Sequence, residues 1–349
     1  MIRRPPRSTL SSSSAASDVY KRQQWYPVAK SVEVRSISPL GIEVLGEKLV
    51  LWRGDNGKVH CIKDQCPHRG APLSFGRLHE GHISCRYHGI VVSGEGVVVS
   101  VPAMKNCPFE GEKIVRAFEV TEIYDAIFIY MPSAENEKAP RMVFPKEFLS
   151  DSWSGFLCTA IWKTNYRYAL DNLADPMHGS YLHAESFTLA YGTKEDLFKV
   201  DHTENGFIVS RTGQLGENFD WTEFEMHDGT MFCFLDIPYP KAAGPGGNMR
   251  IVGFVLPINE NSCKVFFWRM REVSGIQRDC WRFLYRTELE SKHWTVLEQD
   301  REILEAMSDD VRGNEKLYQH DVGVNRIRQT LLKQAKSNVD FELNIEGKS

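Results

Sequence analysis

The sequence has no long hydrophobic run and no excess of positive charge. None of its apolar stretches approaches the roughly 20 residues that a membrane-spanning helix needs, so we expect no membrane span. The formal net charge is −4, and a negatively charged protein has no general attraction for nucleic acid or for anionic lipid. We therefore expect neither a nucleic acid nor a membrane among its partners.

Signal-peptide features and nucleotide-binding motifs are also missing. The eight cysteines occur in a chain without a secretory h-region, so we expect reduced thiols or metal ligands and a cytoplasmic location. No G-x-G-x-x-G fingerprint is present, so the sequence offers no FAD or NAD(P)H site of its own. If the protein uses electrons from such cofactors, a separate protein must supply them.

The first 23 residues have little acidic character, with five basic residues and one acidic residue. An Arg- and Ser-rich start is typical of a transit peptide, but Pro5-Pro6 and a serine run are poor in the amphipathic helix that such a peptide needs. Back-translation of this stretch reproduces two adapters of short-read sequencing libraries, in the correct order and spacing. We therefore predict that residues 1–23 are a disordered translated-adapter artefact and that the native chain starts at or before Gln24.

The remaining chain divides into a strand-rich part and a mixed part. The first contains short β-rich runs between Gly, Asp and Pro turns, and Asn56-Gly57 is typical of a β-hairpin turn. In the second, residues 230–240 and 248–258 are strand-like and predict a hairpin, whereas residues 276–307 have helical periodicity. The fold class that this predicts is α+β, with an all-β domain followed by a domain whose antiparallel sheet is flanked by helices. The predicted parts are a β domain (24–135), a linker (136–152), an α+β domain (153–338) and a tail (339–349).

Two short segments with mixed cysteine and histidine form the first candidate site. Cys66 and His68 are one residue apart, and Cys85 and His88 are two residues apart. Two loops that each offer one thiolate and one imidazole can hold a zinc ion or an iron–sulfur cluster. Zinc fingers usually place cysteine with cysteine and histidine with histidine, so the mixed halves favour an iron–sulfur cluster and leave a zinc-structured module as the alternative.

The segments "CPHRGAPLS" and "CRYHG" resemble the Rieske [2Fe–2S] domain. The resemblance implies that Cys66 and Cys85 bind one cluster iron and that His68 and His88 bind the other. Neutral imidazole in place of thiolate makes that iron easier to reduce, at about −150 to +300 mV. The sequence departs from the pattern at Ile90, where relatives commonly have tryptophan, but this change removes no ligand.

A second candidate site combines two histidines with a carboxylate. His178 and His183 lie in "DPMHGSYLH", and Asp300 lies in "LEQDREILEAM". Two histidines and one carboxylate on one face are the facial triad of non-haem Fe(II) oxygenases, which leaves coordination positions open. Glu298 and Glu302 compete with Asp300 for the third position, and two unrelated histidines are the alternative interpretation.

The spacing of the two histidines requires a distorted backbone. In a straight α-helix, residues five apart lie about 140° from each other and do not share a face. Pro176 and Gly179 can produce the distortion, and a π-type turn would also suit the spacing.

With both constellations in order, the chain resembles the catalytic α subunit of Rieske non-haem iron aromatic ring-hydroxylating oxygenases, of the phthalate, vanillate and phenoxybenzoate type. The resemblance implies that His178, His183 and Asp300 bind a mononuclear Fe(II). Asp175 resembles the family's bridging carboxylate, and Asn172 a polar residue near the iron; a helix-surface amide is the alternative for Asn172.

The resemblance also implies an activity and partners. A separate ferredoxin or flavin-dependent NAD(P)H reductase would deliver electrons, and a head-to-tail homotrimer would place the cluster of one chain near the iron of the next. The expected reaction is ring dihydroxylation of a small aromatic substrate with O₂. The alternatives are an O-demethylase or monooxygenase of a methoxylated aromatic acid, and a pure electron-transfer protein.

Two groups of residues are candidates for the substrate pocket. The first is apolar and mostly aromatic and could line the pocket or fill the core: Phe187, Leu189, Tyr191, Phe219, Trp221, Phe224, Phe232 and Phe234. The second comprises Arg250, Arg269 and Arg271 on predicted strands, which could meet a substrate carboxylate or form a solvated strand face.

Overall fold

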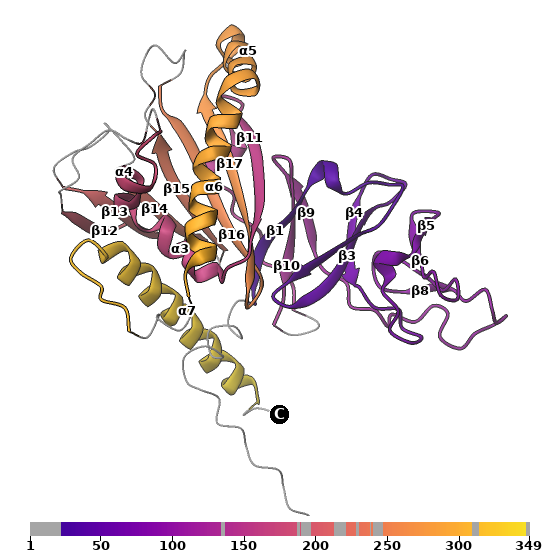
Figure 1. Ribbon diagram of the computed structural model, residues 1–349. Coiled ribbons are helices and arrows are strands. Elements are labelled where there is room, and N and C mark those ends of the chain that lie inside the picture. Colours follow the sequence, from indigo (N-terminus) through magenta and orange to yellow (C-terminus); the bar gives the residue numbers. More distant parts are fainter. Residues whose placement is uncertain are drawn as a thin grey trace, which may run out of the picture.

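The computed structural model describes residues 22–133, 137–186, 189, 197–212, 221–227, 230–237, 239, 247–308 and 314–346, with side chains up to residue 334. Almost all of the segment that we predict to be an adapter artefact lies outside these residues. A strand-rich part and a part built of a large sheet with helices lie side by side (Figure 1). The predicted α+β class, with an all-β domain first, is confirmed.

The N-terminal domain consists of small antiparallel sheets, with strand orders β1-β10-β9, β2-β3-β4 and β5-β6-β7-β8. The predicted hairpin is present, because β3 and β4 pair antiparallel across a turn in which Gly57 has a φ of +80°. The strands are β1 (Gln24–Lys30), β2 (Leu40–Val44), β3 (Glu47–Arg53), β4 (Val59–Lys63), β5 (Arg77–His79), β6 (His82–Ser84), β7 (Val91–Val92), β8 (Val98–Ser100), β9 (Val120–Ile123) and β10 (Ala126–Met131).

The second domain is built on a seven-stranded antiparallel sheet of order β11-β17-β16-β15-β14-β13-β12. The predicted hairpin within it is confirmed, because β15 and β16 pair antiparallel. The strands are β11 (Trp153–Trp162), β12 (Phe198–His202), β13 (Gly206–Arg211), β14 (Trp221–His227), β15 (Thr230–Ile237), β16 (Met249–Asn259) and β17 (Ser262–Glu272).

Both faces of this sheet are buried, and successive side chains alternate between them. On β17, Phe266 and Trp268 pack into a core shared with β1 and β10 of the N-terminal domain. Val265 and Phe267, one residue out of step, pack into the core beneath the helices. Residues 265–268 therefore form a continuous apolar run, and the odd-numbered residues of β17 face the helices.

Most of the helices lie on one face of the sheet (Figure 1). The helical stretch expected at residues 276–307 is α5 and α6, joined through a π-helical turn at Tyr285–Leu289. None of the described helices is long and apolar enough to cross a membrane. The helices are α2 (Lys146–Leu149), α3 (Tyr166–Leu173), α4 (Gly179–Leu182), α5 (Gly275–Leu284), α6 (Glu290–Ala306) and α7 (Val322–Glu346).

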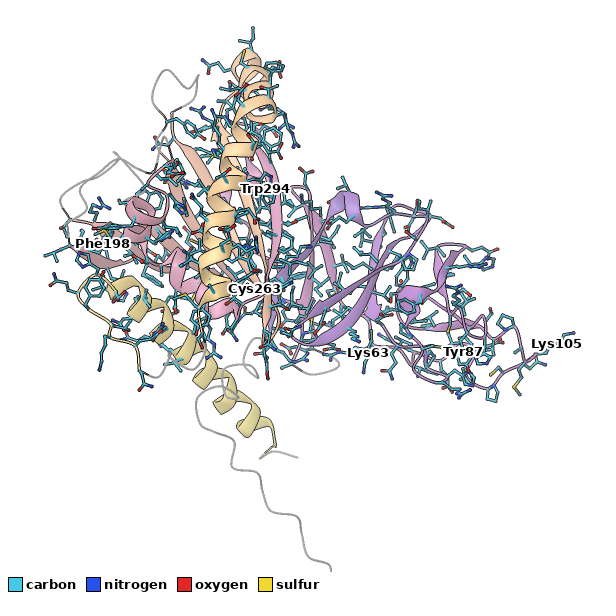
Figure 2. The ribbon with its side chains drawn as sticks, in the orientation of Figure 1. Lys63, Tyr87, Lys105, Phe198, Cys263 and Trp294 are labelled. Atoms are coloured by element: carbon cyan, nitrogen blue, oxygen red, sulfur yellow. The ribbon has the colours of Figure 1, made fainter. Side chains whose placement is uncertain are left out.

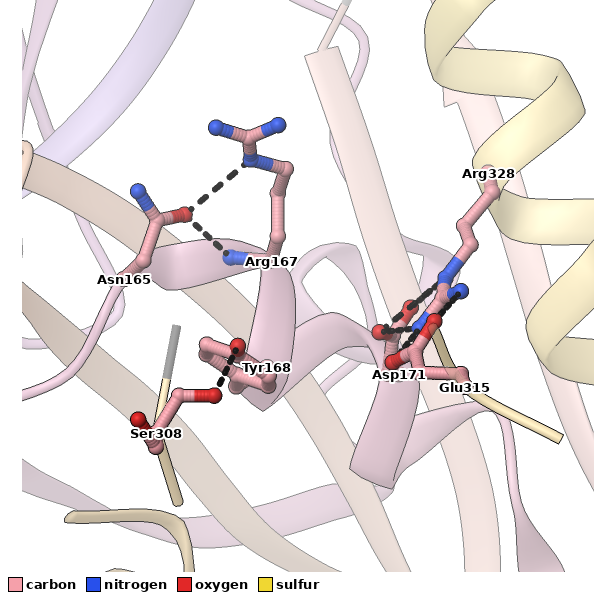
Figure 3. A network of polar contacts seen from close by, with 7 residues as sticks. All are labelled: Asn165, Arg167, Tyr168, Asp171, Ser308, Glu315 and Arg328. Atoms are coloured by element: carbon pink, nitrogen blue, oxygen red, sulfur yellow. Dashed lines mark hydrogen bonds and ion pairs between the residues drawn. The ribbon is translucent and has the colours of Figure 1, made fainter. Parts of the chain in front are cut away.

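Charged contacts tie α3 to the C-terminal helix α7. Arg328 of α7 pairs with Asp171 of α3 at 2.6 Å and with Glu315 at 2.6 Å (Figure 3). At the start of α3, Asn165 caps the helix by accepting a hydrogen bond from the Arg167 backbone N–H. These contacts hold the helix that precedes the candidate iron-binding histidines.

Candidate metal centres and the adjoining cavity

The two cysteine–histidine loops have the same backbone geometry. The Cys66 N–H donates to the Ala71 carbonyl at 2.8 Å, and the Cys85 N–H donates to the Ile90 carbonyl at 2.8 Å. In each loop the glycine four residues after the cysteine donates back to the cysteine carbonyl, and both Gly70 and Gly89 have a φ near +75°. Since this backbone conformation favours glycine, the two "Cys…Gly" spacings produce two matching turns.

The side chains of these loops meet between the turns. The cysteines are buried and their thiols are in hydrogen-bond contact, whereas both histidines are exposed, with ring centroids 4.8 Å apart. Burial raises the pKa of the Cys66 thiol, while backbone N–H groups of His68 and Arg69 favour its thiolate. Thiolates inside and imidazoles toward solvent fit an asymmetric [2Fe–2S] cluster.

The same geometry argues against the zinc alternative. A single tetrahedral ion needs its ligand atoms within about 4 Å of one another, given metal–ligand bonds of about 2.0–2.3 Å. Across the part of the chain that the structure describes, only His178, His183 and Asp300 bring three metal-binding atoms within 4.8 Å of one another. The four cysteine and histidine ligands are therefore more widely spread, as two iron atoms require.

The second candidate site lies between α4 and α6. His178 ends a short 3₁₀ helix, Pro176–His178, His183 follows α4, and Asp300 is on α6. The Nε2 atoms of His178 and His183 lie 3.4 Å and 3.3 Å from the same Asp300 Oδ1. The structure thus brings together three predicted ligands from segments more than a hundred residues apart.

The helical backbone changes type at the histidine segment and does not bulge. The 3₁₀ helix begins at Pro176, and α4 begins at Gly179, so the two predicted distortion points are confirmed. The alternative of a π-type turn at this place is wrong, since residues 176–182 form a 3₁₀ turn followed directly by α4. Proline fits the first position of the 3₁₀ turn, and Gly179 has ordinary right-handed helical dihedrals (φ −55°, ψ −38°), so the convergence of residues five apart needs no conformation reserved for glycine.

Hydrogen bonds to the Nδ1 atoms orient both imidazoles. His178 Nδ1 contacts the carbonyl oxygen of Asp175, and His183 Nδ1 lies 2.9 Å from Oε1 of Gln299. Each acceptor favours a proton on Nδ1, which would leave the Nε2 lone pair available to a bound metal ion, the tautomer that a metal ligand needs. Nothing in the sequence pointed to Gln299, since an amide next to an acid carries no spacing signal.

Asp300 is held ionised in a buried place. Burial raises the pKa of this carboxyl group, but the contacts with His178 and His183 outweigh burial and hold the pKa well below its usual range. Asn172 donates from Nδ2 to Asp300 Oδ1 at 3.2 Å. Of the competing acids, Glu298 pairs with Arg301 and Glu302 is exposed. The geometry favours Asp300 as the carboxylate ligand, and it places the Asn172 amide at the site rather than on an exposed helix face.

Asp175 stands beside this site without joining the triad. Its carboxylate accepts a hydrogen bond from the Met177 N–H at 3.0 Å and caps the 3₁₀ helix. Burial raises the pKa of Asp175, and the nearby His178 opposes that rise. The described contacts give Asp175 a role in orienting His178, and its role as a bridge between subunits stays a prediction.

A cavity of about 670 Å³ opens beside the triad. It lies between α6 and the helix-facing side of the sheet, and His178, His183 and Asp300 form part of its wall. Of the predicted aromatic group, Phe187, Tyr191 and Phe219 lie outside the described residues. Leu189 lines the cavity, but Trp221, Phe224, Phe232 and Phe234 pack in or against the two cores instead. Phe232 and Phe234 do so because side chains alternate along β15, and the even-numbered ones point to the sheet face opposite the cavity.

Two known domain families account for most of the chain. Residues 24–120 match the Rieske [2Fe-2S] domain, and residues 162–337 match the vanillate O-demethylase oxygenase C-terminal domain. The junction falls between β9 and β11, where the strand-rich part gives way to the large sheet.

Individual relatives give the same picture. The chain is 28% identical over 275 residues to protein TIC 55 of Arabidopsis thaliana, covering 70% of this chain and 51% of that protein. It is 31% identical over 172 residues to the vanillate O-demethylase oxygenase subunit of a Pseudomonas species, covering 48% and 46%. The chain thus spans about half the length of the curated relatives it matches.

The fold also matches solved structures. A crystal structure of dicamba monooxygenase superimposes with a TM-score of 0.69 and 23% identity, covering 92% of this chain and 99% of that one. Taken together, both domain matches and the geometry of the two sites lead to one conclusion. The chain belongs to the Rieske-type non-haem iron oxygenases that carry a vanillate O-demethylase oxygenase C-terminal domain.

Proposed function

We propose that the protein is a terminal oxygenase that uses O₂ to oxygenate an aromatic substrate. The observation that carries the proposal is the position of His178, His183 and Asp300 in the wall of a single cavity. A metal ion held by these three protein ligands would keep further coordination positions open to the cavity. A substrate in this cavity is therefore next to those positions.

The chain's own residues supply binding, orientation and charge. When bound, a Rieske cluster supplies electrons one at a time and a mononuclear iron supplies a position for O₂. Gln299 and the Asp175 carbonyl hold the Nε2 atoms of the histidines toward the metal position, and Asp300 provides the negative charge that favours a cation there. Apolar side chains from β15 to β17 line the other wall and exclude water from the substrate.

The separation of the two sites supports a head-to-tail homotrimer. Tyr87, next to His88, lies at the far end of the β domain from Trp294 of α6 (Figure 2). The exposed edges of His68 and His88 can therefore face a neighbouring chain. A heterologous interface that closes into a ring would bring them near the neighbour's Asp175.

The electron supply is a separate protein in this proposal. The sequence has no dinucleotide fingerprint, so a ferredoxin or a flavin-dependent NAD(P)H reductase must deliver electrons to the histidine side of the cluster. The cytoplasm remains the predicted location, since the thiols are unpaired and the candidate cluster uses two of them.

Two reactions fit the same site. Ring dihydroxylation is the reaction that the sequence predicts. O-demethylation is the second candidate, because the C-terminal half matches the domain of vanillate O-demethylase oxygenase. Both reactions place a substrate carbon beside the iron, so the product distinguishes them.

The test uses the iron-loaded, reduced protein with O₂ and a panel of benzoates, phenoxybenzoates, phthalates and methoxybenzoates, with products identified by mass spectrometry. A gain of two oxygens and two hydrogens means dihydroxylation. Loss of a methyl group with release of formaldehyde means O-demethylation. The matched control is the Asp300→Ala protein, which keeps the cluster ligands. Adding substrate to it should cause no uptake of O₂.

The contradicting result is equally clear. If the protein holds both iron centres and no substrate stimulates oxygen uptake, the chain is an electron-transfer protein and the proposal is wrong.

A further inference from the structure

Three arginines on the central sheet differ in what neutralises them. Arg250 pairs with Asp236, and also with Glu147 at 2.7 Å. It is on the even-numbered side of β16, which faces away from the helices and the cavity. Its charge is therefore satisfied by the protein.

Arg269 has no such partner. It is 3% exposed, lies on the helix-facing side of β17 and lines the cavity. Its guanidinium donates to the Tyr285 hydroxyl at 2.9 Å and to the His293 carbonyl at 3.1 Å, and its carbon lies 5.5 Å from the Trp294 ring centroid. Among the described residues no carboxylate pairs with it, and two of its five N–H donors have protein acceptors.

The surroundings of Arg269 add positive charge and polar groups. Arg271, also buried, packs 5.1 Å from the Tyr239 ring centroid, and its Nε and Nη1 have no hydrogen-bond partner among the described residues. The Tyr239 hydroxyl contacts His293 Nε2 at 2.5 Å. Tyr239 and His293 both line the cavity. A buried cation is costly unless an anion pairs with it, so this end of the cavity is suited to an anionic ligand.

We propose that Arg269 anchors an anionic oxygen group of the substrate, and that the cavity takes single-ring aromatic carboxylates in preference to neutral aromatics of the same shape. A planar guanidinium matches a carboxylate, because both are flat and offer two parallel hydrogen bonds. The inference rests on the proposed function, since it assumes that the cavity holds the substrate.

The position of the anchor agrees with a one-ring substrate. His293 and Asp300 are seven residues, or two turns, apart on α6, which is about 10 Å along the helix axis. An aromatic ring with a carboxylate at one side and the oxidised group at the other spans a comparable length. The carboxylate would thus lie at Arg269, away from the negative charge of Asp300, and the far side of the ring would face the triad.

The test measures binding rather than turnover. The ligands are 4-methoxybenzoate and its neutral isostere 4-methoxybenzamide, titrated anaerobically into the iron-loaded protein by calorimetry. We expect the acid to bind about 30-fold or more tightly than the amide, since losing one partner of a buried charged hydrogen bond has at least this effect on affinity.

Two variants and one control locate the effect. In Arg269→Met the preference for the acid should disappear, and in Arg269→Lys it should survive in part, because the charge remains without the planar fork. Arg286→Met removes a similar charge that pairs with Glu290 on an exposed helix face, so it should keep the full preference. Thermal melting and the cluster absorbance check folding, and the wild-type comparison stands even if Arg269→Met does not fold.

Three outcomes overturn the inference: equal binding of acid and amide by the wild type, retention of the preference in folded Arg269→Met, or binding of neither ligand. These outcomes differ from a failure of the proposed function. Oxygen uptake with neutral aromatics alone would refute the anion anchor and keep the oxygenase. Arg269-dependent binding of the acid, without oxygen uptake from any substrate, would keep the anion anchor and refute the oxygenase.

Discussion

Gln299 accepts a hydrogen bond from His183, with Oε1 and Nδ1 2.9 Å apart. Gln299 immediately precedes Asp300, so one turn of α6 supplies both the carboxylate of the candidate iron site and the acceptor that orients one of its histidines. This arrangement couples the two sides of the site through a single helix.

Replacing Gln299 should weaken iron binding without changing any ligand. Gln299→Leu removes the acceptor for His183 Nδ1, so the imidazole loses its preferred tautomer, and we expect a roughly 10- to 100-fold loss of affinity for the mononuclear iron. Gln299→Glu keeps an acceptor and should restore binding. Competition with a chelator measures the affinity, and Glu298→Gln on the same helix is the control. Unchanged affinity in Gln299→Leu would show that His183 needs no such support.

Removing the carboxylate should empty one site and spare the other. In Asp300→Ala we expect the loss of one iron per chain, because two histidines alone hold Fe(II) poorly, while the visible spectrum of the cluster is unchanged. Metal analysis and absorbance measure the two effects. Glu302→Ala, which changes an exposed acid two residues away, should keep full iron content. Equal iron in both variants would contradict the assignment of Asp300.

Exchanging a cluster histidine should lower the reduction potential. His68→Cys puts a thiolate on the imidazole-bound iron, so the potential should fall from the Rieske range toward about −400 mV. A redox titration followed by absorbance measures it. His79→Cys, on exposed β5, should leave the potential unchanged. Two outcomes would contradict the ligand assignment. One is loss of the red-brown colour in both variants, and the other is a coloured His68→Cys protein whose reduction potential is unchanged.

His293 should make stability depend on acid pH. Burial, with help from Arg269, lowers the pKa of His293 to about 3, below the unfolded value of about 6.5. Between these values the unfolded chain binds a proton that the folded protein does not, so stability present above pH 6.5 is lost as the pH falls. His293→Gln should flatten this decline by about 1.4 kcal/mol per pH unit. Denaturant titrations from pH 7 to pH 5 measure the slope, and a slope equal to wild type would contradict the buried neutral imidazole.

The charged link between α3 and α7 should stabilise the fold. Arg328→Met leaves Asp171 and Glu315 close together without their common cation, and we expect a loss of about 1–2 kcal/mol in the free energy of unfolding, reduced by partial exposure. Denaturant unfolding measures it. Arg301→Met breaks exposed pairs within α6 and should change stability little. Equal losses of stability in both variants would show that the α3–α7 ion pairs stabilise the fold no more than the exposed pairs within α6.

Several elements of the site follow directly from local sequence. The cysteine–histidine loops could be located because ligands two or three residues apart must share a loop, and because glycine is needed where φ is positive. Pro176 and Gly179 predicted the segment in which a 3₁₀ turn gives way to α4, and Asn56-Gly57 predicted a hairpin. In each case the determining contacts lie within a few residues.

Other features depend on contacts between distant segments. Nothing near Gln299 in the sequence shows that it faces His183, because the two meet only when the segment after α4 folds against α6. The aromatic residues of β14 and β15 were candidates for the pocket. However, the even-numbered residues Phe232 and Phe234 of β15 point to the sheet face opposite the cavity and pack into the core there. Periodicity reveals that a strand alternates; only the packed sheet decides which face meets the helices.

The sequence by itself predicted the four candidate cluster ligands, the two candidate iron-binding histidines, the order of the domains and the class of the fold, because these depend on residue type and short-range spacing. The tertiary structure alone placed Asp300, rather than Glu298 or Glu302, beside the two candidate histidines, since burial and direction on α6 distinguish acids that are neighbours in sequence. It also distinguished Arg269 from Arg250, because the residues that pack against each arginine decide whether a carboxylate neutralises its charge. Arg250 pairs with Glu147, whereas Arg269 donates to the Tyr285 hydroxyl.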